Sequence, residues 1–198
     1  MRSGRNVTPA GRLDRTWLYA AVGPRLTRYE VDTERALLRA CESVQLPAGV
    51  MYAWRHARLP LLYVACSDGG PGRYGSRHFA CDLRIQGDGR LAPFADPVAL
   101  RWRPVHISTD RDSAHALFAY CDPAGVSVMR IEADGRLGEE VPQAPLRLAK
   151  MAHQILATPS NDRVIVPCRG NDAKGDRPED PGSLEVFAYR NGSLSHLQ

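Results

Sequence analysis

A ten-residue segment that begins and ends with leucine occurs three times in this chain, and it constrains the fold more than any other feature. The copies span residues 37–46, 91–100 and 137–146. An apolar strand end stands six residues before each first leucine, and two of the intervening turns carry the Asp-Gly pair favoured in tight hairpins. Recurrence in register indicates a repeat architecture.

Each repeat contains several short strand patterns. Apolar segments (WLYAAV, LLYVAC, ALFAYC and VIVPC) precede alternating segments such as VSVMRI, then a turn, another strand and a return segment such as RPVHIS or MAHQILAT. The apolar segments are anchored at Tyr19, Tyr63, Phe118 and Ile165, which lie 44 to 55 residues apart. Four antiparallel strands in about 40–50 residues make one β-propeller blade. The sequence therefore predicts an all-β propeller of about four blades.

The blade count predicts an open array. Leu194 takes the place of the first leucine of a fourth copy, and its partner would fall beyond Gln198. We therefore expect an incomplete part of a larger ring, with a closed ring of four blades as the competing arrangement. No helical period is sustained over three turns, which argues against α/β solenoids. We expect a flexible lead-in at residues 1–15 and one partial propeller domain at residues 16–198. The blades of this domain are expected at residues 16–46, 47–100, 101–146 and 147–198.

Composition narrows the possible partners. The net charge is +4, and all but two of the 26 basic residues are arginines scattered among acids, which argues against nucleic-acid binding. No apolar run approaches the roughly 18 residues of a membrane helix. The lead-in lacks the apolar stretch of a secretory signal, although its arginines leave a transit peptide open. We expect a cytoplasmic protein without membrane contact.

The five cysteines show no CxxC spacing, so a disulfide framework or a metal site is not expected. Three of them, Cys66, Cys121 and Cys168, follow apolar strand cores. This recurrence predicts that the three thiols are buried and unpaired and that they occupy matching positions in consecutive blades.

Standard catalytic motifs are absent, so any chemistry must come from residues that converge on a propeller face. His153 precedes the innermost strand of the fourth blade and could transfer protons, or could bond a neighbouring blade. Arg169 follows VIVPC and could hold a carboxylate or phosphate, or could pair with Asp172. His106, in RPVHIS, is either structural or a substrate contact. The loop at 171–182 lacks calcium-ligand spacing and reads as a solvated excursion.

The chain resembles the lactonase family of seven-bladed propellers. The resemblance covers about residues 16 to 198, and TPSNDRVIV matches the family's S-P-D-G-R-x-L-Y-V turn. It implies that His153, in AHQ, is the active-site histidine. The family's later Arg and Glu strings have no counterpart here, so the chain is expected to be the N-terminal half of such a protein.

The resemblance implies a cofactor-free and metal-free hydrolase that opens a sugar lactone such as 6-phosphogluconolactone in its full-length form. His153 would be the catalytic base, and Arg169 and His106 would bind substrate. We expect this fragment to be inactive by itself and to self-associate through its open blade edges. The alternatives are a carboxymuconate-type lactonizing cyclase and a non-catalytic propeller that serves as a binding scaffold.

Overall fold

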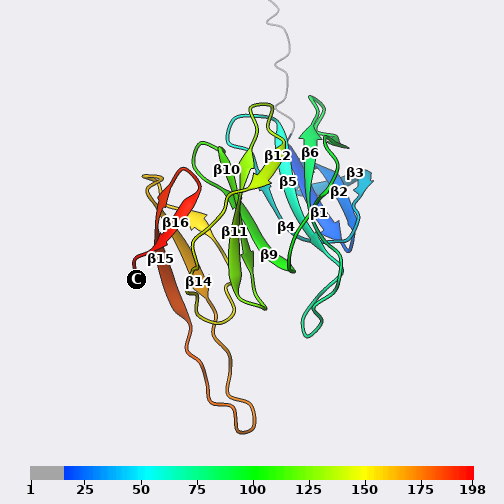
Figure 1. The fold of residues 1–198 in the computed structure, drawn as a ribbon. Coiled ribbons are helices and arrows are strands. Elements are labelled where there is room, and N and C mark those ends of the chain that lie inside the picture. Colours follow the sequence, from blue (N-terminus) through cyan, green and yellow to red (C-terminus); the bar gives the residue numbers. More distant parts are fainter. Residues whose placement is uncertain (1–15) are drawn as a thin grey trace, which may run out of the picture.

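The computed structural model describes residues 16–198, which form strands and turns without a helix. The strands make four antiparallel sheets, each built from consecutive segments of the chain (Figure 1). This confirms the predicted all-β, partial-propeller fold. The expected lead-in at 1–15 lies outside the described residues.

The sheets follow one another along the sequence. The first has the order β1-β2-β3, with the bounds Thr16–Val22, Arg25–Asp32 and Leu37–Gln45. The second contains β4 (Gly49–Arg55), β5 (Leu61–Ser67), β6 (His78–Ile85), β7 (Leu91–Pro93) and β8 (Val98–Ala99). The third contains β9 (Pro104–Thr109), β10 (His115–Tyr120), β11 (Gly125–Ile131) and β12 (Leu137–Glu140). The fourth contains β13 (Leu156–Ala157), β14 (Arg163–Cys168), β15 (Ser183–Arg190) and β16 (Ser193–His196).

Two sheets depart from the regular four strands. The first has three strands within the described residues, and in the second both β7 and β8 pair with β6, so the outer strand is split. The sequence analysis placed the segments RPVHIS and MAHQILAT at the end of a repeat, as return segments. In the structure they begin the next sheet, where they supply its inner edge strand, β9 or β13. Inner edge strands place their side chains near the propeller axis.

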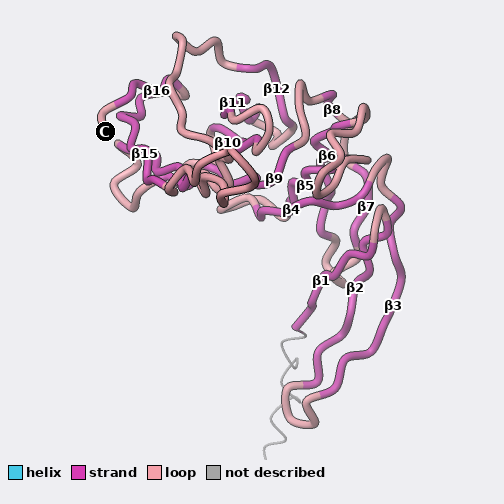
Figure 2. The backbone as a smooth tube through the Cα atoms, turned by 90° about the horizontal axis from the view of Figure 1, so that it is seen from below, coloured by secondary structure: helices cyan, strands magenta, loops and turns pink. Residues whose placement is uncertain are grey.

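The array is open. Within residues 16–198, β1 pairs only with β2 and β16 only with β15, so no strand links the first sheet to the last. The two end sheets lie apart in both views of the chain (Figures 1 and 2). A closed ring of four blades, the competing arrangement, is therefore wrong for the described residues.

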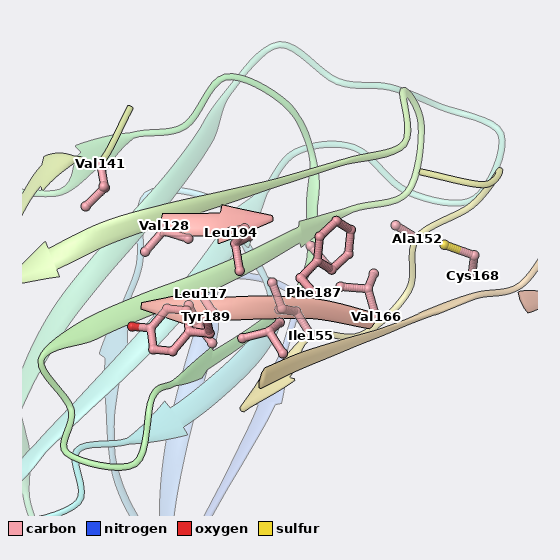
Figure 3. Close-up of a cluster of buried hydrophobic side chains, with 12 residues drawn as sticks. Leu117, Val128, Val141, Ala152, Ile155, Val166, Cys168, Phe187, Tyr189 and Leu194 are labelled. Atoms are coloured by element: carbon pink, nitrogen blue, oxygen red, sulfur yellow. The ribbon is translucent and has the colours of Figure 1, made fainter. Parts of the chain in front are cut away.

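The hydrophobic core consists of clusters of side chains packed between neighbouring sheets. Along β10, Leu117 and Ala119 face the fourth sheet, while Ala116 and Phe118 face the second. Because both faces of this strand are covered, it is apolar at nearly every position. Figure 3 shows the cluster between the third and fourth sheets, where Phe187 and Tyr189 of β15 meet Leu117 of β10.

The Asp-Gly turns join each blade to the one before it. The Tyr19 hydroxyl donates to the carbonyl of Gly89 at 2.6 Å, and Tyr63 repeats this contact one blade later with Gly135 at 2.7 Å. Gly135 has φ +92°, and a Cβ there would lie 2.2 Å from Cδ1 of Leu61. Glycine is therefore required both by the backbone conformation and by the close approach.

The cysteine prediction is partly wrong. Cys66, Cys121 and Cys168 are buried and free, as expected. However, Cys66 and Cys168 pack toward the preceding blade, whereas Cys121 lies just past β10 with its Sγ 3.6 Å from Sδ of Met151 in the following blade. Side chains alternate along a strand, so a shift of one residue changes the face. Tyr120 therefore occupies the position that Cys66 and Cys168 fill.

The outward faces of the two end sheets predict self-association of this chain. Val22 in β1 and Leu184 in β15 are 76% and 64% exposed and lie on faces of the end sheets that no other sheet covers within the described residues. Such faces are larger than monomers usually leave bare. We expect a mass above that of a monomer in analytical ultracentrifugation, reduced by Leu184→Glu. A monodisperse wild-type monomer contradicts the prediction.

Candidate functional site

One cavity of about 510 Å³ brings together all three candidate residues, His106, His153 and Arg169. It is lined by the second, third and fourth sheets, from their inner strands and the loops that follow β5, β10 and β14. The two long loops, 68–77 and 169–182, extend toward the same side of the molecule, the lower side in Figure 1. The fold therefore gathers residues from three repeats at one end of the inner strands.

His153 lies on the inner edge of the fourth sheet. Its backbone N–H donates to the carbonyl of Pro167 in β14 at 2.9 Å, and Ala152 beside it forms a β-bridge with Cys168. These contacts hold the backbone, while the side chain is exposed and lines the cavity. Within the described residues its ring has no hydrogen-bond partner. The alternative of a bond to a neighbouring blade is therefore not seen.

His106 forms a buried wall of the same cavity. It lies on β9, is 2% exposed, and its ring centroid is 4.3 Å from that of Tyr52. Burial, with a smaller contribution from His153, lowers the pKa of His106 to about 4. Its Nδ1 accepts the N–H of Ile155 at 3.4 Å. The neutral ring therefore carries its hydrogen on Nε2 and can act as a donor.

Two guanidinium groups supply positive charge to the cavity. Arg169 is exposed and Arg103 is half-buried, and neither forms an ion pair within the described residues. The alternative pairing of Arg169 with the Asp172 carboxylate is therefore not seen. Burial raises the pKa of the Cys121 thiol, and both cavity arginines oppose that rise. Both guanidinium groups and Cys121 line the same cavity.

Arg103 and Tyr52 were not predicted from the sequence. Arg103 directly precedes β9, three residues before His106, and this spacing is the only signal that could have found it. The arrangement can hold an anion between Arg103 and Arg169. It can also place a proton acceptor, His153, and a neutral donor, His106, in the same cavity.

A second cavity of similar size, about 590 Å³, lies against the third sheet and is lined by residues 101–102, 124–126 and 140 and by the segment 142–148 that follows β12. Proline and aliphatic side chains line much of it, and its charged residues Arg101 and Glu140 pair with each other at 3.4 Å. It therefore offers less unpaired charge than the cavity around His153. Among residues 16–198 no His, Cys, Asp or Glu group could hold a metal ion, and no helix could cross a membrane.

Stacked antiparallel sheets, built from consecutive segments and with a cavity at their inner strands, define the chain as a β-propeller protein. The chain belongs to the lactonase family of seven-bladed propellers, because the family described as "Lactonase, 7-bladed beta-propeller" matches residues 18–173. This match confirms the resemblance found in the sequence, and it spans the strands that supply His106, His153 and Arg169.

Individual relatives agree with the family. The chain is 34% identical over 113 residues to a 6-phosphogluconolactonase of Pectobacterium atrosepticum, covering 57% of this chain and 32% of that protein. The periplasmic gluconolactonase of Pseudomonas aeruginosa has a similar fold, with TM-score 0.62, 19% identity, and coverage of 87% and 63%. The chain thus spans about a third of the first relative and less than two thirds of the second.

Structural likeness alone extends to other activities. Hydrazine synthase of Kuenenia stuttgartiensis also matches, with TM-score 0.57 and 12% identity, covering 88% of this chain and 46% of that one. The fold therefore does not identify a substrate. Because one gluconolactonase relative is periplasmic, the cytoplasmic location stays a prediction.

Proposed function

We propose that the full-length protein hydrolyses a sugar lactone, with 6-phosphogluconolactone as the substrate. The observation that carries this proposal is the cavity in which His153, His106, Arg103 and Arg169 converge. Membership of the lactonase family and the Pectobacterium relative support the reaction class. The two unpaired guanidiniums favour a substrate that bears a phosphate group.

In the proposed mechanism, a water molecule attacks the lactone carbonyl carbon. His153 accepts a proton from this water, which its exposed ring can reach. Negative charge develops on the carbonyl oxygen, and cations and N–H donors aimed at that oxygen lower the barrier. His106 can supply such a donor from Nε2, since its Nδ1 is occupied by the Ile155 amide. Collapse of the intermediate breaks the ring C–O bond, and the proton that His153 accepted passes to the released ring oxygen, which gives the hydroxy acid.

Two other functions are alternatives to lactone hydrolysis. In a lactonizing cyclase, His153 would move a proton to or from carbon while a carboxylate closes the ring. In a non-catalytic propeller, the same cavity would only bind a metabolite. Candidate groups for anion binding and for proton transfer line one cavity, and this supports an enzyme over a scaffold.

The proposal is tested by measuring lactone opening with pure protein and subtracting the spontaneous rate. We expect the full-length protein to open 6-phosphogluconolactone faster than glucono-δ-lactone, and we expect residues 1–198 alone to remain at the background rate. Cyclisation of a muconate without lactone hydrolysis favours the cyclase. Ligand binding without either reaction favours the scaffold.

A further inference from the structure

The loop between β5 and β6, residues 68–77, forms part of the cavity wall. Pro71 and Gly72 at its tip line the cavity together with His106 and Arg169. The loop has a defined internal structure: the Asp68 carboxylate accepts the N–H groups of Ser76 and Arg77 at 2.8 and 2.9 Å. It is therefore a built wall beside the candidate site rather than a loose excursion.

One hydrogen bond fastens this loop to the third blade across the cavity rim. The Tyr74 hydroxyl donates to Oδ2 of Asp122 at 2.9 Å. Asp122 also lines the cavity, in the short connection after β10. Asp122 raises the pKa of Cys121 while Arg103 and Arg169 lower it, after the larger effect of burial. The Asp122 carboxylate and both guanidinium groups line the same cavity as this thiol.

Although these opposite charges line one cavity, Asp122 forms no ion pair with Arg103 or Arg169 within the described residues. Its acceptor capacity is directed to Tyr74 instead. A carboxylate that lost this donor would take the nearest alternative, and guanidinium groups are the strongest donors available to it. The bond from Tyr74 holds Oδ2 of Asp122, and a carboxylate held in this way leaves Arg103 and Arg169 available to an external anion.

The loop also positions one of these arginines. A Cβ on Gly69 would lie 2.6 Å from Cδ of Arg103 and 2.2 Å from the carbonyl oxygen of Tyr74. The aliphatic part of the Arg103 side chain therefore packs directly on the loop backbone at Gly69, where any side chain would collide with it. Gly70, the next residue, has nothing within 4 Å of its Cβ position.

We propose that the 68–77 loop is a specificity-determining segment, which selects phosphate-bearing ligands by holding Asp122 through Tyr74 and by seating Arg103. The inference rests on the proposed function, since it names what selects the substrate in that cavity. It concerns binding, so it is measured without turnover.

The first test is Tyr74→Phe, with the double variant Tyr74→Phe/Asp122→Asn. Calorimetric titration of the 198-residue chain with inorganic phosphate and glucose 6-phosphate should show about five- to tenfold weaker binding by Tyr74→Phe, the size of one modest hydrogen bond. In the double variant, Asp122→Asn removes the carboxylate charge that Tyr74→Phe leaves without its donor, so the affinity for phosphate should be restored. Neutral glucono-δ-lactone should bind all three proteins equally.

The second test compares Gly69→Ala with its neighbour Gly70→Ala. Gly69→Ala should weaken phosphate binding by a similar factor or more, and Gly70→Ala should bind as the wild type does. Circular dichroism melts confirm that each variant is folded.

Three results would overturn the inference: unchanged phosphate affinity in Tyr74→Phe, loss that Asp122→Asn does not restore, or no phosphate binding by the wild type. The inference and the catalytic proposal fail separately. Full lactone turnover by His153→Gln removes the proposed mechanism and leaves the phosphate selectivity intact.

Discussion

Replacing His153 by glutamine is expected to lower lactone turnover in the full-length protein by about 10²–10⁴-fold, the usual contribution of a positioned acid–base group. The side chain is exposed to the cavity, so glutamine fits without displacing a packed neighbour. The backbone contacts at Pro167 and Cys168 do not involve the ring, so folding should be preserved. The measurement is lactone hydrolysis corrected for spontaneous opening, together with a thermal melt.

A matched histidine serves as the control. His196 lies on the outer strand β16, where its Nε2 meets Glu185 at 2.8 Å, away from the cavity. His196→Gln should hydrolyse the lactone at the parental rate. If a folded His153→Gln protein also keeps the parental rate, His153 is structural and the proposed mechanism is wrong.

The repeat was predictable because it depends on local chemistry. Asp-Gly turns, alternating strands and the leucine spacing all act over a few residues, and they place β6, β7, β11 and β12 close to where the structure has them. His153 was put forward because it lies in a stretch that resembles the family, and its catalytic role stays a prediction. The cavity therefore contains the residues that sequence reasoning put forward.

The features that could not be predicted depend on which face of a strand a side chain occupies and on contacts between residues that are far apart in the sequence. Cys121 follows an apolar segment in the sequence as Cys66 does, yet Cys66 lies within β5 and Cys121 just past β10, and this shift of one residue turns Cys121 toward the opposite neighbouring blade. Arg103 is one of many arginines, and only the fold brings it beside Arg169. The bond from Tyr74 to Asp122 joins residues 48 positions apart through a loop insertion, and no spacing rule reports such a contact.

Truncating Phe118 to alanine is expected to reduce the free energy of unfolding by about 3–5 kcal/mol, the usual cost for a fully buried phenylalanine. Phe118 is 0% exposed and lies between the second and third sheets, where it contacts the cluster that contains Tyr63 and Ile107. Removing the ring leaves a cavity where these two blades meet. Because domains are only marginally stable, this loss is a large part of the total. Urea denaturation of the variant measures it.

Phe94 provides the matched control, because it undergoes the same chemical change outside the core. It is half-buried after β7, with the Arg84 guanidinium 4.0 Å from its ring centroid. Phe94→Ala should therefore cost roughly 1 kcal/mol. If Phe118→Ala does not fold, Phe118→Leu, which keeps most of the volume, should unfold at a lower urea concentration than the wild type. Equal losses from Phe118→Ala and Phe94→Ala would show that the contact between the second and third blades does not depend on Phe118.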